Sequence, residues 1–301
     1  YDEVDWVFYL PADTKKNSKK FLNIVNPIKV IFIKYEFWFN YMAKLNKKNI
    51  PFYSVSSIFR KEQSFFKYDW FAKQLNNVSH FFVQDQNSKE LLKKIGFSNC
   101  TVAGDTRFDS VASNTQNAIS IPLIEKFSEN KTTIICGSTW PKDEALLAKY
   151  IKENPNYNYI IAPHEMQHIN ELKKQTNALL FSKADSTNIS NSTVLIIDSI
   201  GILSNIYKYG DLAYIGGGFG SGIHNILEAV AYGLPVVFGP NYQKFKEANE
   251  LINKKGAISI SNYTELTSAI HDLSTFDKNI AINYIKENSG ATTKILNSII
   301  T

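Results

Sequence analysis

The sequence predicts an α/β protein with two domains, each built on a parallel β-sheet. Short apolar segments alternate with helical segments along most of the 301 residues, and this order is typical of parallel sheets covered by helices. The alternation pauses in a polar stretch at 105–131 and then restarts. The chain is also longer than one small core usually supports. We therefore expect residues 1–112 and 113–284 to form two domains, with a helix at 285–301 packing back on the first.

In the first half, a short apolar strand is expected at 4–10, ending at Pro11. A buried strand at 30–33 follows Pro27 and leads into the aromatic segment KYEFWFN. A helix at 87–95 stops at Gly96, since glycine commonly ends helices. The other elements expected here are helices at 17–26, 40–48 and 65–75, strands at 50–55, 80–84 and 100–103, and a weak helix at 123–127.

In the second half, Pro141 suits the first position of a helix at 141–152 because its missing N–H has no helical partner there. A helix ending at Tyr209 follows a strand that leads into Asp198. The other elements expected are strands at 132–136, 159–162, 193–197 and 234–238, and helices at 169–176, 245–255 and 279–300.

Residues 214–240, YIGGGFGSGIHNILEAVAYGLPVVFGP, are the most informative segment. They predict a strand, a glycine-rich loop, a helix and a second strand. Glycines let main-chain N–H groups approach an anion closely. We expect His224 and Asn225 in the first helical turn and Glu228 on the same face as His224. This arrangement predicts a cradle for a phosphate and a ribose hydroxyl, the alternative being a tight turn that binds nothing.

Other candidate residues also follow predicted strands. In open parallel sheets, ligands bind beyond the carboxyl ends of the strands. Pro163-His164, Ile200-Gly201, the glycine loop and His224-Asn225 come at or just after such ends. The sequence therefore predicts one nucleotide-sized site in the second domain, although His164 could merely cap a strand end.

The net charge of the chain limits the kinds of partner that it is expected to bind. A formal charge of +5 and a pI near 8.9 are too mild for a dedicated nucleic-acid binder, but they suit an anionic substrate or membrane surface. The lysines that could contact such a surface, or could simply face solvent, are those at 15, 16, 19, 20, 44, 47 and 48.

Metal and disulfide chemistry are not expected. Cys100 and Cys136 have no paired spacing, and no DxD or His-x-His motif is present. No apolar run is long enough to span a bilayer. The chain opens at Tyr1 with DEVDWVFYLP, which reads like the interior of a domain, so we expect an N-terminal portion to be missing.

A series of motifs carries a family resemblance. In chain order they are YLPAD, KYEFWFN, GDTRFD, GSTWPKDE, IIAPHE, IIDSIGILSNIYKYGDLAYIGG, HNILEA and GLPVVFGPNYQKFKEA. Together they resemble the 3-deoxy-D-manno-octulosonic acid (Kdo) transferases of lipopolysaccharide synthesis. The resemblance implies a GT-B-type glycosyltransferase, with two Rossmann-like domains whose parallel sheets face a cleft.

The resemblance also implies a function. Kdo would pass with inversion from CMP-Kdo to a lipid A precursor of the lipid IVA type, at the cytoplasmic face of the bacterial inner membrane. It implies no cofactor and no metal. Glu36, Lys34 and Arg107 match catalytic segments, although Arg107 could instead only tie its segment to Asp105 or Asp109. The implied CMP contacts are Pro163, His164, Ile200, Gly201, Ile202, Asn225, Ile226, Leu227 and Glu228, with His224 beside them.

Some positions depart from the family pattern. Lys34 stands at the family's acidic stabiliser, His164 at a usual Arg and Ile202 at a usual Glu. The family's general-base Glu lies in a region that this chain lacks. Two alternatives therefore stay open: a sugar-nucleotide epimerase of the same fold, and a CMP-binding fragment without activity.

Overall fold

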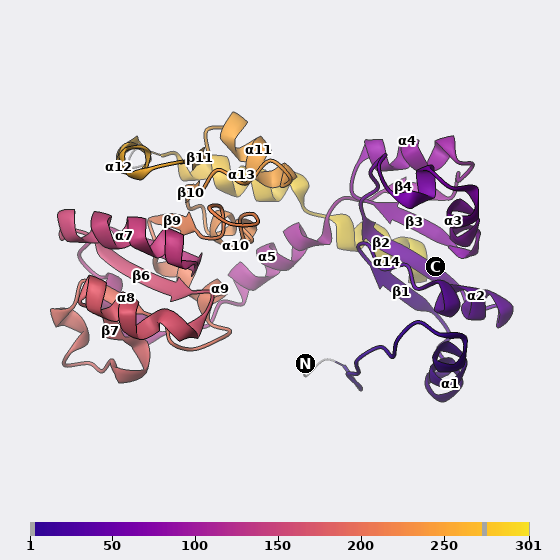
Figure 1. Cartoon of the computed structure of the whole chain (residues 1–301), viewed down its shortest axis with the longest axis horizontal. Helices are drawn as coiled ribbons and strands as arrows, with labels where there is room; N and C mark the ends of the chain where they lie inside the picture. Colours follow the sequence, from indigo (N-terminus) through magenta and orange to yellow (C-terminus); the bar gives the residue numbers. More distant parts are fainter. Residues whose placement is uncertain (1–3, 273–275, 301) are drawn as a thin grey trace. The chain divides into compact units, whose positions relative to one another are not determined.

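The chain forms two α/β units. The structure is a computed structural model, and it describes residues 4–272 and 276–300. Residues 1–109 and 288–301 form the first unit and residues 110–287 the second, whereas the sequence places the boundary at residue 112. Helices α5 (Thr106–Gln116) and α13 (Lys278–Asn288) each run across this division (Figure 1).

The first unit is built on a four-stranded, all-parallel sheet in the order β1-β2-β3-β4. Its strands are β1 (Val30–Ile33), β2 (Phe52–Ser57), β3 (His80–Val83) and β4 (Cys100–Val102). Its helices are α1 (Lys15–Val25), α2 (Phe39–Lys47), α3 (Asp69–Gln74), α4 (Gln86–Lys94) and α14 (Ala291–Ile300).

The two faces of this sheet are buried by different helices. Phe81 belongs to a core that includes residues of α1, α2 and α4. Its neighbour Phe82 belongs to another core, with Ile295 and Ile299 of the C-terminal helix α14. Adjacent strand residues point to opposite faces, so the two phenylalanines anchor the two layers. Thr301, at the end of the predicted helix 285–301, lies outside the described residues.

The second unit is built on a seven-stranded parallel sheet in the order β11-β10-β9-β5-β6-β8-β7. Its strands are β5 (Thr133–Thr139), β6 (Asn158–Pro163), β7 (Leu179–Leu180), β8 (Val194–Ile196), β9 (Leu212–Ile215), β10 (Val236–Phe238) and β11 (Ala257–Ser259). Its helices are α6 (Pro122–Ser128), α7 (Pro141–Glu153), α8 (Ile169–Thr176), α9 (Leu203–Ile206), α10 (Leu227–Ala231), α11 (Lys246–Asn253) and α12 (Tyr263–Asp272).

Strand β5 lies at the centre of this sheet, between β6 and β9. Side chains of β5, β6 and β9 form one core with α7, α8 and α12. Because all the strands are parallel, the loops after Thr139, Pro163 and Ile215 emerge at the same edge. That edge carries the predicted nucleotide-binding segments.

Several expectations about the elements are wrong. The helix expected at 279–300 is two helices, α13 and α14, and the strand expected to be buried at 30–33 is an exposed edge strand. Residues 4–10 form no strand, and Trp6 and Tyr9 are exposed. The segment expected to be polar and only weakly helical contains the eleven-residue helix α5. Phe108 and Val111 of that helix are buried, so packing stabilises it.

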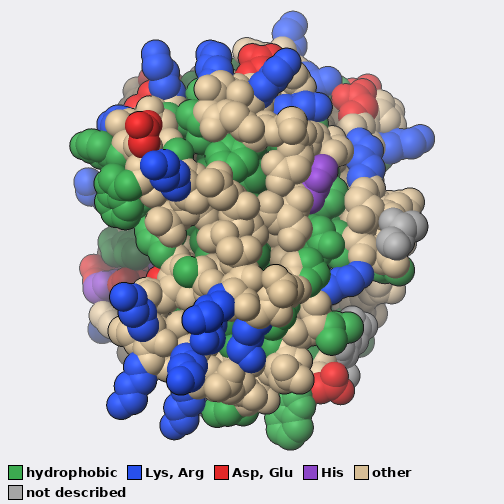
Figure 2. All heavy atoms as spheres, turned by 90° about the vertical axis from the view of Figure 1, so that its right-hand side faces the viewer, with side chains coloured by type: hydrophobic (Ala, Val, Ile, Leu, Met, Phe, Trp, Pro, Cys, Tyr) green, Lys and Arg blue, Asp and Glu red, His purple; other side chains and the backbone are tan. Residues whose placement is uncertain are grey.

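The surface of the first unit has two notable features. Strand β1 is an edge strand, and its Ile31 and Ile33 are 46% and 56% exposed. Lysines gather low on the face shown in Figure 2, at the height of α1 in Figure 1. The four lysines of α1 are all exposed. Among the described residues, no helix is long and apolar enough to cross a membrane.

Candidate functional site

Three aromatic side chains from three loops of the second unit meet at the carboxyl edge of its sheet. The rings of Trp140 and His164 stack, with their centroids 4.6 Å apart and an angle of 23° between their planes. The His164 ring lies 4.5 Å from the ring of His224. The structure thus brings together two predicted site residues, His164 and His224, and adds Trp140.

A hydrogen bond fixes the proton on His224. The Trp140 indole Nε1–H donates to His224 Nε2 across 2.8 Å. Because an indole nitrogen can only donate, Nε2 must accept, and the neutral ring carries its proton on Nδ1. Burial lowers the pKa of His224, and the nearby His164 lowers it further. His224 is therefore a neutral donor through Nδ1 at physiological pH.

Asp143 joins the glycine loop to helix α7. It is fully buried, and its Oδ2 accepts from the backbone N–H groups of Trp140 at 2.9 Å and Gly217 at 3.0 Å. Its Oδ1 accepts from the Tyr214 hydroxyl at 2.7 Å. Buried carboxylates need such partners. The bonds hold the loop after β9 against the first turn of α7.

The helix after the glycine loop begins later than the sequence predicts. Helix α10 has five residues and starts at Leu227, so the prediction that His224 and Asn225 lie in its first turn is wrong. The His224 N–H donates to Gly216 O at 3.1 Å. The Asn225 side chain accepts from the Leu227 N–H at 3.2 Å. Neither the His224 nor the Leu227 amide is therefore a bare donor for an anion.

Glu228 lies beside hydroxyl groups. Its Oε1 accepts from Asn225 Nδ2 at 3.0 Å, and it lines a small cavity with Ser204 and Tyr232. The Tyr232 hydroxyl is buried without a hydrogen-bond partner among the described residues. Burial raises the pKa of Tyr232, and the charge of Glu228 adds to the effect. This cavity has no room for a water-sized molecule, so the partly exposed Glu228 carboxylate, and not the buried Tyr232 hydroxyl, is the group that a ligand's hydroxyl groups could reach.

The other residues that are predicted to contact the nucleotide differ in how exposed they are to solvent. Pro163 ends β6 and is buried, and Ile226 and Leu227 belong to the core. Ile200 is 89% exposed. Gly201 has a φ of +94° and open space around its Cα. Ile202 immediately precedes α9.

The predicted catalytic residues lie in the first unit. Lys34 follows β1 with a left-handed φ of 61° and is exposed, as is Glu36. Glu36 lines a cavity of about 420 Å³ whose other walls are mainly aromatic.

Arg107 pairs with Asp105 through Nε and a terminal nitrogen, both at 2.8 Å from Oδ2. Ser56, with a left-handed φ of 52°, donates to Asp105 Oδ1 at 3.3 Å. The Arg107 side chain therefore does bind Asp105, as the structural alternative to a catalytic role expects.

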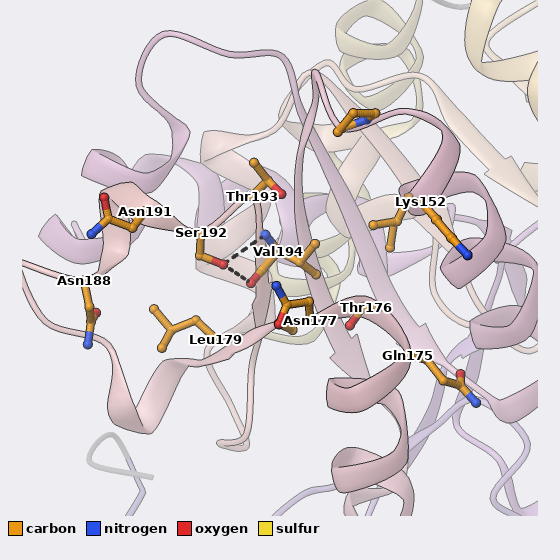
Figure 3. Close-up of a pocket in the computed structure, with 13 residues that line it drawn as sticks. Lys152, Gln175, Thr176, Asn177, Leu179, Asn188, Asn191, Ser192, Thr193 and Val194 are labelled. Atoms are coloured by element: carbon orange, nitrogen blue, oxygen red, sulfur yellow. Dashed lines mark hydrogen bonds between the residues drawn. The ribbon is translucent and has the colours of Figure 1, made fainter.

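Two cavities of similar size lie in the second unit. One, of about 560 Å³, is bordered by the glycine loop, the start of α7 and Phe245. The other, of about 580 Å³, lies near the amino end of β8 and the carboxyl ends of α7 and α8. Figure 3 shows it lined by amide and hydroxyl side chains, with Lys152 at one side. Only the first is at the edge that carries the predicted site.

Within residues 4–272 and 276–300, no three histidine, cysteine or acidic side chains cluster as metal ligands.

Sequence reasoning missed Trp140 and Asp143. A partial signal exists for Asp143, since an acidic residue three positions after the residue preceding a helix often accepts from that residue's N–H. Trp140 and His224 are separated by 84 residues, so no local pattern links them.

Comparisons with known proteins agree with the motifs. Residues 1–110 match the family model described as 3-deoxy-D-manno-octulosonic-acid transferase (kdotransferase). A bifunctional glycosyltransferase/methyltransferase of Fusobacterium nucleatum is 25% identical over 93% of this chain and 48% of its own length. A 3-deoxy-D-manno-octulosonic acid transferase of Aquifex aeolicus is 26% identical over 93% of this chain and 75% of its own length. The chain thus spans about half of the first relative.

A solved structure supports the fold. The UDP-GlcNAc 2-epimerase of Neisseria meningitidis covers 95% of this chain with a TM-score of 0.65 and 13% identity, and 79% of that structure is matched. At this identity the likeness concerns the fold alone, and it agrees with the predicted GT-B-type class of two parallel-sheet α/β units. Residues 1–110 thus match the Kdo transferase family, and the chain is similar to Kdo transferases over most of its length.

Proposed function

We propose that this chain belongs to a glycosyltransferase that moves Kdo from CMP-Kdo to a lipid A precursor, with inversion, during lipopolysaccharide synthesis. The similarity to Kdo transferases along 93% of the chain supports the reaction class. The observation that carries the nucleotide assignment is Glu228, a partly exposed carboxylate held by Asn225, which directly follows His224 of the Trp140–His164–His224 cluster.

In this proposal the second unit binds the cytidylate. Asn225 orients Glu228 through a 3.0 Å hydrogen bond, and Glu228 accepts from the ribose hydroxyls. The loops at Pro163-His164 and Ile200–Ile202 border the base and phosphate. The exposed Ile200 and the open space at Gly201 leave room for that contact.

The reaction needs an acceptor hydroxyl, a base and stabilisation of the leaving group. The acceptor oxygen bonds to the anomeric carbon as the bond to the phosphate oxygen of CMP breaks, and a base takes the hydroxyl proton. Charge grows on the departing phosphate, where a cation stabilises it. We assign that role to Arg107, with Asp105 fixing its orientation, and electrostatic roles to Glu36 and Lys34. The base is not among the residues assigned here.

The lysines of α1 suit a peripheral position on an anionic membrane surface, where we propose that the lipid acceptor is met. Basic residues near such a surface contribute about 1 kcal/mol each. The proposed transfer needs no metal for two reasons: CMP has a single phosphate, and basic side chains can neutralise it.

The proposal is tested by calorimetry with CMP. Replacing Glu228 by Ala should weaken CMP binding by about 1–3 kcal/mol, the range for losing a charged hydrogen-bond partner. Glu129→Ala is the matched control, because it removes an exposed carboxylate of the same unit. Equal CMP affinity in wild type and Glu228→Ala would contradict the nucleotide assignment.

The two alternatives predict other outcomes. A sugar-nucleotide epimerase would turn over UDP-GlcNAc without any acceptor. A fragment that only binds would titrate with CMP and show no transfer.

A further inference from the structure

The cavity drawn in Figure 3 lies away from the candidate site. Its volume of about 580 Å³ is within the usual range for small-ligand pockets. Thr193, directly before β8, lines it together with Lys152 of α7 and Thr176 of α8. Because the helices between parallel strands run against those strands, the carboxyl ends of α7 and α8 lie at the amino edge of the sheet. The candidate site is at the carboxyl edge, so this cavity has no role in the proposed function.

Amide and hydroxyl side chains line this cavity on more than one wall. Asn177 directly follows α8, and Asn191 belongs to the segment before β8 (Figure 3). Within the described part of the chain, the side chains of Asn177, Asn191 and Thr193 have no hydrogen-bond partner. An amide side chain both donates and accepts, and so does a hydroxyl. These groups therefore match the hydroxyl groups of a ligand, which also do both.

The wall that carries Asn191 is held in place by its own hydrogen bonds. Asp185 Oδ1 accepts from the backbone N–H of Asn188 at 2.9 Å. Asn188 Nδ2 in turn donates to Lys183 O at 3.0 Å. Ile189, the next residue, is fully buried and anchors the segment. A wall that is already ordered binds a ligand without the entropy cost of ordering it first.

The charges around the cavity favour a neutral ligand. Among the described residues, Lys152 is the only charged one that lines it. Lys152 lies in the last turn of α7, where a cation offsets the partial negative charge of the helix end. Lys173 and Lys174 do the same for α8 from outside the cavity. The carbonyl groups of the helix ends disfavour an anion, whereas Lys152, with no carboxylate beside it in the lining, disfavours a cation.

We propose that this cavity is a binding site for an uncharged sugar, whose hydroxyl groups bind Asn177, Asn191 and Thr193. Pro155 and Leu179 add apolar surface for the C–H groups of the sugar ring. The site is independent of the proposed function, because it requires neither CMP nor Kdo.

Two substitutions remove hydrogen-bonding groups and keep the fold. Asn177 has a left-handed φ of 51°, which glycine adopts freely at the end of a helix, so Asn177→Gly removes only the amide. Thr193→Val removes the hydroxyl and keeps a branched side chain before β8. Asn130→Gly is the matched control, because Asn130 is also exposed, has a φ of 67° and does not line the cavity.

The experiment is an NMR titration of the whole chain with glucose. Glucose should bind with a Kd of about 1 mM and shift the backbone amides of residues 175–179 and 191–194, which line the cavity. Asn177→Gly and Thr193→Val should each weaken glucose binding about fivefold, as expected for the loss of one hydrogen bond. Asn130→Gly should bind glucose as the unchanged protein does, and CMP affinity, measured by calorimetry, should be the same in all of them.

Two charged analogues test the choice of a neutral ligand. Glucosamine and glucuronate resemble glucose in size but carry a positive and a negative charge in slightly acidic buffer, and each should bind at least about fivefold more weakly than glucose. Binding of either analogue more tightly than glucose would overturn the proposal.

The cavity is a solvent-filled hollow only, and the proposal fails, if glucose does not saturate or if its shifts lie away from the cavity. Glucose affinity that is unchanged in both variants would also overturn it. Should Asn177→Gly not fold, Thr193→Val decides. The glucose result decides this site whether or not the protein binds CMP, so the site and the proposed function are tested separately.

Discussion

The Trp140 indole N–H and His224 Nε2 are joined by a 2.8 Å hydrogen bond between two strand-end loops of the second unit. Protonation of His224 would place a hydrogen on Nε2, facing the indole donor. The bond therefore exists only with neutral His224. The arrangement of Trp140 and His224 beside the proposed donor site therefore depends on pH.

We predict that the free energy of unfolding falls as the pH is lowered from about 7.5 to about 5. Burial lowers the pKa of His224, with His164 adding to the effect, and burial also lowers the pKa of His80, with Lys89 adding to it. A histidine with a depressed folded-state pKa stabilises fully above its ordinary pKa, and the stabilisation is lost as the pH falls through the folded-state value. Each group contributes at most about 1.4 kcal/mol per pH unit.

Urea unfolding across that pH range measures the slope. His224→Gln and His80→Gln should each reduce it. A slope that is unchanged in both variants would refute the assignment of the pH dependence to these two residues.

Gly216 and Gly220, two glycines of one loop, should differ sharply in how well they tolerate replacement by alanine. A Cβ on Gly216 would lie 2.2 Å from Ser138 O, a backbone atom, whereas a Cβ on Gly220 would meet only Gly217 O at 3.4 Å. We expect Gly216→Ala to destabilise by about 3 kcal/mol and Gly220→Ala by less than about 1 kcal/mol. Thermal unfolding of the two variants checks this, and equal melting temperatures would contradict it.

Tyr232→Phe should change neither folding nor CMP binding. The hydroxyl is buried without a partner in the described part of the chain, so its removal leaves no group unsatisfied and should not reduce stability. The cavity beside it has no room for a ligand, so CMP affinity should also stay the same, unlike in Glu228→Ala. Calorimetry and thermal unfolding measure the two quantities. A variant that melts much earlier, or that loses CMP affinity, would contradict this prediction.

Metal removal should have no effect. Because CMP has one phosphate, we expect CMP affinity, and Kdo transfer by the active enzyme, to be the same in excess EDTA and in excess Mg²⁺. Loss of either in EDTA, with recovery on adding Mg²⁺, would be the contrary result.

The sequence predicts the sheets well because buried parallel strands are short apolar runs. Residues 159–162 are such a run, and they lie in β6, which is buried throughout. Residues 30–33 form β1, but they lie at the edge of the sheet with Ile31 and Ile33 exposed, so the prediction that this strand is buried is wrong. The same rule fails at 4–10, where Trp6 and Tyr9 are apolar but have no neighbouring strand. An apolar run predicts a strand only where a partner is available.

Helix α5 shows the opposite failure. Its start depends partly on a distant group, since the Thr106 N–H donates to Ser56 Oγ at 3.2 Å. The Arg107 N–H donates to the nearby Asp105 Oδ1 at 2.9 Å. Ser56 lies 50 residues away from Thr106. Local propensity therefore underestimates this helix.

The site was only partly accessible to sequence reasoning. The glycine loop and Glu228 follow from local pattern. The hydrogen bond from the Leu227 N–H to the Asn225 side chain is also local, although the N-cap of α10 is Ile226. The Trp140–His164–His224 cluster depends on three loops converging, which the pairing of β5 with β6 and β9 brings about.

The open side of β1 has a practical consequence. Among the described strands β1 has one unpaired edge, and such an edge with half-exposed isoleucines is a template for other chains, so the protein should form larger species as its concentration rises. Replacing the exposed Ile31 and Ile33 by lysine should keep the protein monodisperse, as light scattering would measure, and suitable for crystallisation.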